Sequence, residues 1–280
     1  MQLQYYSYAL VETKQANLGI YPENKNKPEI VKEMLYEHLS EKTFPHYGST
    51  LGFLVTDEIG EYLICTLGKK STNTIAKSPA EQFKVEHQDD WKRSKLFFFL
   101  HPQAQYVAAE YKPSIFSNPL NQLNAIAEQL NIVLLGKGYE LIFRPILKEE
   151  IFWDAINEYK GSIQKVQFDY VAPNWLNTTS KIHEGLKDYK AKYGITDLSL
   201  TLENKEGNLV VPEDDETLKE NVEEATKGGG RITVKAKNKI VYSSEKKSNV
   251  KSQEVFIEMD LEGGDDATII EALRKVFEHV

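Results

Sequence analysis

The chain has 280 residues, of which 41% are hydrophobic and 27% are charged, and its formal net charge is −8. This apolar content supports one large core or two ordinary ones, and the absence of a long low-complexity run excludes wholesale disorder. The longest apolar stretch, residues 96–100, is about a quarter of what a bilayer span needs, and the single cysteine, Cys65, excludes an internal disulfide. We therefore expect a globular, cytoplasmic protein that does not insert into the membrane.

The first half of the chain is rich in predicted strands. Residues 1–11 have the aromatic and β-branched character of a strand, and residues 30–39 place apolar side chains at helical spacing after Pro28. Two apolar runs separated by the turn signature of residues 57–60 indicate a hairpin. Three further strands and a helix are predicted at residues 81–87, 95–101, 105–111 and 119–130. We assign residues 1–135 to a strand-rich N-terminal domain with two helices.

Helices and strands alternate more regularly in the second half. Strands are predicted at residues 140–146, 163–170, 198–202 and 255–261, and helices at residues 147–159, 181–193, 215–225 and 268–276. The three glycines 228–230 follow a predicted helix, so they indicate a helix stop rather than a dinucleotide-binding loop. We assign residues 139–280 to a C-terminal domain in which helices cover one face of a mixed or antiparallel sheet. The predicted fold class is therefore α+β with two domains.

A short basic hairpin, residues 231–251, stands out in this acidic chain. Residues 231–237 alternate strictly, so that one face is apolar and the other carries cations. Eight basic residues and one acid lie within residues 227–251. Such a row can hold a polyanion such as DNA or RNA, although lysines are also a common means of blocking unwanted pairing at a sheet edge. The candidate nucleic-acid-binding residues of this hairpin are Arg231, Lys235, Lys237, Lys239, Lys246 and Lys247.

A second candidate contact patch is Trp91 followed by Lys92 and Arg93, because an aromatic ring can stack on bases while adjacent cations bind phosphates. The alternative interpretation is a solvated loop before a strand. Residues 203–224 carry nine acids and two lysines immediately before the basic hairpin. We expect this acidic segment to shield the hairpin, because adjacent blocks of opposite charge attract each other.

No motif in the chain identifies a reaction. The six histidines lack metal-ligand spacing, and residues 68–72 lack the glycine spacing of a phosphate-binding loop. Asp197 and Glu203 are candidates for a metal-dependent nuclease, but they are six residues apart in one predicted strand, about 20 Å along it. Cys65 lies in an apolar strand and is interpreted as a buried thiol. The sequence therefore predicts no catalytic residue, no metal ligand and no cofactor, and it favours a binding protein over an enzyme.

The order of elements in the second half resembles a known family. Segments 141–146, 166–174, 198–203 and 230–237 follow one another in an order and spacing similar to those of RexA-like phage-exclusion proteins and related uncharacterised families of bacterial defence loci. The resemblance covers mainly residues 139–261 and includes no diagnostic catalytic motif. It implies phage defence, DNA binding and self-association, although the acidic charge of this chain departs from what DNA binding favours.

We expect a component of bacterial phage defence, of the abortive-infection kind, that binds or senses nucleic acid without being an enzyme. Its expected partners are DNA or RNA, a second copy of the chain in a homodimer, and a second defence protein. The homodimer expectation rests on the edge hairpin and on the apolar side of the last helix, which carries Ile269, Ile270, Leu273, Val276 and Phe277. Two alternatives stay open: a metal-dependent nuclease whose acids converge from distant positions, and a protein-binding scaffold in a defence complex.

Overall fold

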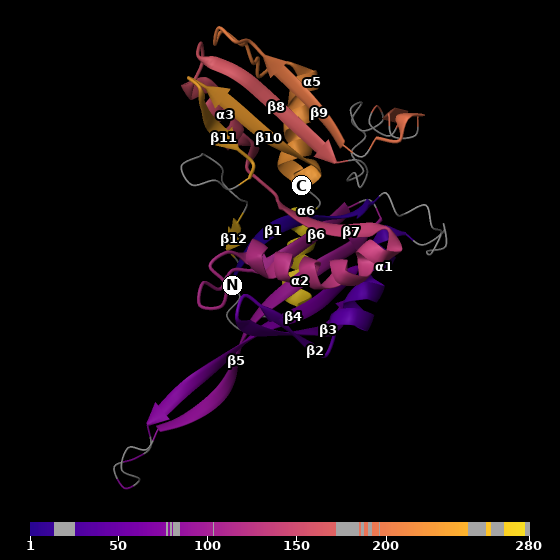
Figure 1. Ribbon diagram of the computed structural model, residues 1–280, viewed down its shortest axis with the longest axis vertical. Coiled ribbons are helices and arrows are strands. Elements are labelled where there is room, and N and C mark those ends of the chain that lie inside the picture. Colours follow the sequence, from indigo (N-terminus) through magenta and orange to yellow (C-terminus); the bar gives the residue numbers. More distant parts are fainter. Residues whose placement is uncertain are drawn as a thin grey trace.

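Two antiparallel β-sheets organise the protein, and helices pack against both (Figure 1). This is a computed structural model. The residues that it describes are 1–13, 26–76, 78, 80, 85–102, 104–171, 185, 188–189, 192–195, 197–245, 256–258 and 266–277. The mixed content of helices and antiparallel strands agrees with the coarse fold class expected from the sequence.

The larger sheet has eight strands in the order β12-β1-β6-β5-β4-β3-β2, and β7 also pairs with β1. Both β12 and β7 lie on the edge of β1 that faces away from β6, at successive stretches of β1. The strands are β1 (Gln2–Glu12), β2 (Lys42–His46), β3 (Ser49–Ile59), β4 (Tyr62–Ala76), β5 (Val85–His101), β6 (Ala104–Glu110), β7 (Tyr139–Pro145) and β12 (Phe256–Glu258).

Strand β1 is buried on both faces. Tyr6, Tyr8 and Leu10 pack into a core with helices α1 (Lys27–Met34) and α2 (Pro119–Leu134), whereas Leu3 and Tyr5 pack on the opposite face with helix α6 (Asp266–Phe277). A strand covered on both sides needs apolar or aromatic side chains at successive positions. This explains why residues 1–11 lack the alternation of a half-buried strand.

Helix α2 positions strand β7 beside β1. The Asn118 side chain caps the start of the helix by accepting a hydrogen bond from the Leu120 backbone N–H at 2.8 Å. The helix ends in the 3₁₀ turn η4 (Leu135–Lys137), and Gly138, with φ of +85°, reverses the chain into β7. The amide of Asn131 then bonds to both the N–H and the C=O of Leu141, at 2.7 and 3.0 Å. These bonds fix the position of α2 along β7.

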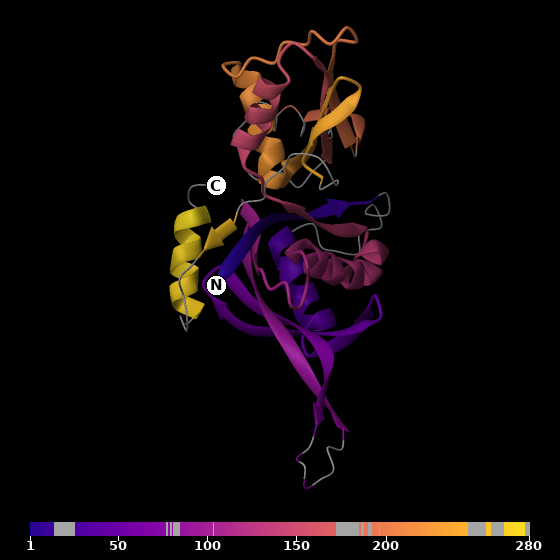
Figure 2. The same ribbon diagram turned by 90° about the vertical axis from the view of Figure 1, so that its left-hand side faces the viewer.

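The smaller sheet has the order β11-β10-β8-β9, and all of its neighbouring strands are antiparallel. Helices α3 (Glu149–Glu158) and α5 (Glu216–Glu224) pack on one face of it, as Figure 2 shows, around a core that includes Phe168, Val222 and Val234. The strands are β8 (Ile163–Val171), β9 (Asp197–Glu203), β10 (Gly230–Ala236) and β11 (Lys239–Ser243). The predicted helix at residues 181–193 lies mostly outside the described residues.

The two sheets meet where α5 ends. The helix continues into a turn of π-helix, η5 (Ala225–Gly229), in which Gly228 has φ of +91°. The carbonyl oxygen of Gly228 accepts hydrogen bonds from Ser7 Oγ at 3.3 Å and from Arg144 Nη1 at 3.4 Å. The Leu147 N–H donates to the Thr226 carbonyl oxygen at 2.9 Å. The glycine run therefore ends a helix, as predicted, and also joins the smaller sheet to β1 and β7.

Several strands differ from the predicted ones. The predicted strands at 81–87 and 95–101 merge into the single 17-residue strand β5, although residues 81–84 lie outside the described part of the chain. Its pairing with β4 continues from Tyr62↔Phe99 out to Ala76↔Val85. The outer part of this β4–β5 hairpin projects away from the body of the protein as an arm (Figures 1 and 2).

The sheets do not divide where a domain boundary was predicted. The prediction placed everything after residue 139 in a C-terminal domain, but β7, β12 and α6 all join the larger sheet. The smaller sheet with α3 and α5 is thus inserted between β7 and β12. Pairing between strands far apart in the sequence produces this difference, because β7 completes the edge of β1 at Tyr6↔Pro145 to Glu12↔Tyr139.

Candidate nucleic-acid interface

The smaller sheet has an open face on which no described helix packs. Its core face buries Ile232 and Val234, so the alternation of β10 turns Arg231, Thr233 and Lys235 to the opposite side. The predicted apolar and cationic faces are therefore confirmed for residues 231–236, whereas Lys237, predicted on the cationic face, lies in the β10–β11 turn. We define the open face by these three residues and by their neighbours in register on the adjacent strands: Lys165, Gln167, Asp169, Ser199, Thr201 and Glu203.

Cations concentrate at one end of the open face, which we call the lysine end. Lys235 on β10 lies directly opposite Lys165 on β8, and Lys165 lies opposite Glu203 on its other side. Lys237 and Lys239 follow at the β10–β11 turn and are exposed. Like charges directly opposite each other on a sheet are destabilising. The register thus places two like charges next to each other on the open face, with Glu203 on the other side of Lys165.

The β10–β11 turn fixes the outer lysines in space. Its two central residues, Lys237 and Asn238, have φ values of +49° and +60°, as a two-residue type I′ hairpin turn requires. The Asn238 N–H donates to Gln164 Oε1 at 2.7 Å, and Lys237 Nζ lies 6.0 Å from the centre of the Tyr159 ring. The last two basic candidates of the hairpin, Lys246 and Lys247, lie outside the described residues.

Acids accompany the cation at the other end of the open face. Arg231 lies opposite Asp169 and forms an ion pair with Glu245, with Nε and Oε1 3.0 Å apart. Asp169 Oδ1 also accepts hydrogen bonds from Gln167 Nε2 at 2.7 Å and from Ser199 Oγ at 2.6 Å. A polyanion approaching the open face therefore meets more unopposed positive charge at the lysine end than near Arg231.

Helix α5 of the acidic segment does not shield the hairpin, which corrects the expectation from the sequence, whereas Glu203 at the start of the segment lies on the open face opposite Lys165. Helix α5 packs through Leu218 and Val222 on the core face of the sheet, opposite the open face. Glu223 forms an ion pair with Lys227 at 2.7 Å, and the side chain of Glu224 is only 1% exposed. Opposite charge in adjacent segments did not place the two blocks together, because burial of the apolar side of α5 determines where its acids lie.

The patch of Trp91, Lys92 and Arg93 lies at the base of the projecting arm, at the opposite end of the molecule from the smaller sheet (Figure 1). The Trp91 ring packs over two glycines: a Cβ added to Gly52 or Gly68 would lie 3.1 or 3.0 Å from ring carbons. Lys92 and Arg93 are exposed. The structure therefore does not bring this patch and the basic hairpin together, and one side of the tryptophan ring serves packing.

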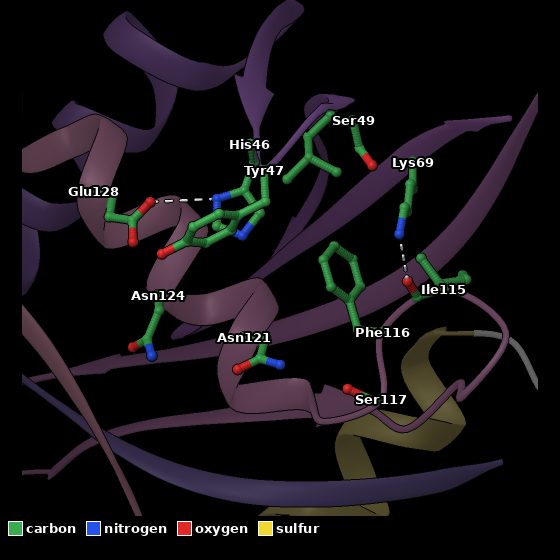
Figure 3. A pocket seen from close by; sticks show the side chains of 11 residues that line it. His46, Tyr47, Ser49, Lys69, Ile115, Phe116, Ser117, Asn121, Asn124 and Glu128 are labelled. Atoms are coloured by element: carbon green, nitrogen blue, oxygen red, sulfur yellow. Dashed lines mark hydrogen bonds and ion pairs between the residues drawn. The ribbon is translucent and has the colours of Figure 1, made fainter.

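A polar pocket of about 330 Å³ lies between the β2–β3 hairpin and α2. Figure 3 shows His46 and Tyr47 of the hairpin facing Asn121, Asn124 and Glu128 of the helix. His46 Nδ1 lies 3.3 Å from Glu128 Oε2. A carboxylate holds an imidazole in this way in many acid–base sites. Although Ser49 and Ser117 also line the pocket, no hydrogen bond joins either hydroxyl to His46 in the described part of the chain, so we assign no nucleophile here.

Residues considered for other chemistry lie apart or are buried. Asp197 and Glu203 stand at the two ends of β9, as expected, and no group of three potential metal ligands occurs among the described residues. Cys65 is fully buried, as predicted, and burial raises the pKa of its thiol well above the ordinary value. Among the described helices, none has both the length and the apolar character needed to cross a membrane.

Sequence reasoning missed Lys165 and Arg144. Lys165 occupies a strand in which Val166, Phe168 and Tyr170 share one face, so its own face was predictably open. Its position opposite Lys235 was not predictable, because no local pattern specifies which strands pair. Arg144 interrupts the apolar strand β7, and this interruption was the available signal for its role at the junction of the two sheets.

Comparison with known proteins leaves the family open. No family model matches the chain, and no curated protein matches it. The resemblance to RexA-like proteins is therefore still a prediction from the order of elements, and function has to be argued from the geometry of the open face.

Proposed function

We propose that the protein binds nucleic acid through the lysine end of the open face, as a non-enzymatic component of phage defence in the bacterial cytoplasm. The observation that carries the proposal is the direct pairing of Lys165 with Lys235, next to Lys237 and Lys239. Phosphate groups bound between these side chains would relieve their repulsion and release counterions. Support for the defence role comes from the resemblance of residues 139–261 to RexA-like proteins, which also makes a second defence protein an expected partner.

The proposed contact is with the sugar–phosphate backbone rather than with bases. None of the residues that define the open face is aromatic, so this face offers no platform on which bases could stack. Lysines bind phosphates without reading sequence. We therefore expect weak sequence preference, binding of both DNA and RNA, and a strong dependence on salt. The proposal treats the smaller sheet with α3 and α5 as a separate domain that presents this face.

The test is a salt titration with a triple variant. Lys165→Gln, Lys235→Gln and Lys239→Gln are combined, and binding of fluorescent single-stranded and duplex oligonucleotides is followed by anisotropy from about 50 mM salt upwards. Each phosphate contact contributes about 0.7–0.9 to the slope of log affinity against log salt. The triple variant should therefore bind at least about tenfold more weakly, with a slope smaller by about 2 to 3.

A matched control removes the same charge elsewhere. Lys148, Lys219 and Lys275 are exposed and lie away from the open face, so replacing all three with glutamine should leave the salt slope unchanged. Equal affinity of the two triple variants, both folded by circular dichroism, would remove the open face as the binding site. Magnesium-dependent cleavage of the oligonucleotides would favour the nuclease alternative instead.

A further inference from the structure

A cleft of about 720 Å³ lies between the two sheets, away from the lysine end. Helix α2 and strand β7 form one side, and the start of β10 with Ser244 and Glu245 forms the other. Figure 1 shows β7 at the end of the larger sheet that is next to the smaller one, with α2 below it. Binding sites for small organic ligands usually have volumes of about 300–1,000 Å³. The cleft thus has room for a ligand much larger than a single inorganic ion.

Arg144 is one of the charged residues that line this cleft. It lies opposite Ser7 in the β1–β7 ladder, and the residue is half-buried. Within the described part of the chain, its guanidinium donates one hydrogen bond, to the Gly228 carbonyl oxygen at 3.4 Å. A guanidinium has five N–H donors, so most of the hydrogen-bonding capacity of Arg144 is available to a ligand.

A second arginine faces the same space. Arg231 lines the cleft and is paired with Glu245 at its rim. The pKa of Arg144 is lowered to about 10, chiefly by burial and also by the positive charge of Arg231, while Glu245 and Asp197 act in the opposite direction. Both guanidinium groups line the cleft, together with the carboxylates of Glu128, Glu140 and Glu245. The fork of donors on each guanidinium suits phosphate oxygens.

Asn121 and Asn124 of α2 also line the cleft, and both border the pocket beside His46 as well. Asn131 forms hydrogen bonds with Leu141. Asn124 precedes Asn131 by seven residues, over which a helix rises about 10 Å. Strand β7 rises about 10 Å from Leu141 to Arg144, and it runs antiparallel to α2 because a short turn joins them. Asn124 therefore lies level with Arg144, and Asn121 is one helical turn further on. Both amides are exposed and make no hydrogen bond in the described part of the chain.

We propose that the cleft binds a nucleotide, with its phosphate on Arg144 and Arg231 and the hydrogen-bonding edge of its base on Asn121 and Asn124. An amide group offers both a donor and an acceptor, which is the pattern that a base edge requires. The ligand is a phosphate joined to a heterocycle, supplied either by a free mononucleotide or by the terminal nucleotide of a strand. The inference goes beyond backbone binding at the lysine end: of the four residues on which it depends, only Arg231 also belongs to the open face, and none lies at the lysine end.

The experiment measures binding of AMP, ATP, GTP, inorganic phosphate and a 5′-phosphorylated trinucleotide by calorimetry and thermal shift. We expect at least one nucleotide to bind more tightly than inorganic phosphate. Arg144→Gln should weaken that binding by about tenfold or more, because it removes charge-assisted hydrogen bonds. The exposed double variant Asn121→Ala with Asn124→Ala tests the base edge without touching the junction, so the test holds if Arg144→Gln does not fold.

A matched control separates the two sites. Lys235→Gln lies on the open face and does not line the cleft, so it should leave nucleotide affinity unchanged while weakening oligonucleotide binding. Binding of the trinucleotide alone, lost in the asparagine variant, would identify a strand end as the source of the ligand. Failure of every nucleotide and of the trinucleotide to bind at millimolar concentration would overturn the proposal. Equal binding of inorganic phosphate and nucleotides, unaffected by the asparagine variant, would overturn it as well.

Discussion

Gly228 lies at the junction of the two sheets, where the close approach of β1 leaves no space for a side chain. Its φ is +91°, and an added Cβ would lie 2.0 Å from Ser7 Oγ and 2.8 Å from Ser7 Cβ. The sequence indicated a helix stop here, since glycine adopts this conformation without strain. The close approach to β1 was not predictable, because Ser7 is far away in the sequence.

We predict that Gly228→Ala lowers the free energy of unfolding by about 2 kcal/mol or more, through backbone strain and the clash with Ser7. Urea unfolding followed by circular dichroism measures the change. The control is Gly136→Ala, where an added Cβ meets nothing within 4 Å. That variant should keep or slightly raise the stability, by about 0.5 kcal/mol. Equal stabilities of the two variants would contradict the tight junction.

At the scale of secondary-structure elements, local sequence signals predicted where helices begin and end better than they predicted which strands pair. The helix predicted at residues 215–225 begins at its predicted start, where Asp215 Oδ1 accepts a hydrogen bond from the Leu218 N–H at 2.7 Å. In contrast, the outer part of the β4–β5 arm pairs polar with polar residues, such as Ser71 with Asp90 and Thr72 with Asp89. Such residues carry no apolar alternation, so the sequence indicated a loop where backbone pairing forms a ribbon.

Because Lys165 lies opposite Lys235, one substitution should affect stability and nucleic-acid binding in opposite directions. We predict that Lys235→Gln raises the free energy of unfolding by about 0.3 kcal/mol, because it removes repulsion across the strands, and lowers affinity for oligonucleotides. Denaturant titration and anisotropy measure the two quantities on one sample. The exposed Lys219→Gln on α5 serves as the control and should change neither. A loss of stability in Lys235→Gln would show that the lysines are not in repulsive contact.

Helix α5 offers a separate test of electrostatic shielding. Because its apolar side faces the core, Glu220→Gln and Glu223→Gln should leave oligonucleotide affinity unchanged within about twofold at physiological salt, where charges beyond about 8 Å are screened. Replacing Glu203, which lies opposite Lys165 on the open face, should instead tighten binding. Anisotropy titrations of the two variants distinguish these outcomes. Tighter binding after the α5 substitutions would restore the shielding hypothesis.

At the scale of the whole molecule, the packing of helix α6 does not support the dimer contact expected from the sequence. Ile269, Ile270 and Leu273 of α6 were predicted to offer a surface to a second copy, but they are buried against the larger sheet. A different surface is available on β9, whose outer edge pairs with no described strand. Leu198 and Leu202 of this strand are half-buried, and Leu200 is 37% exposed. An edge with unpaired backbone groups beside a row of leucines is suited to pairing with a second sheet.

We predict a symmetric dimer in which two β9 strands pair antiparallel, so that two smaller sheets become one sheet with a continuous open face. Two lysine ends on one surface would bind a single strand more tightly than either end alone, because the second contact is intramolecular. Light scattering should give twice the chain mass at micromolar concentration. Leu200→Lys places like charges opposite each other at the symmetry axis and should give a monomer with weaker oligonucleotide binding. Leu54→Lys, at a leucine 42% exposed on β3, should keep the dimer, so dissociation in both variants or a monomeric wild type would contradict this contact.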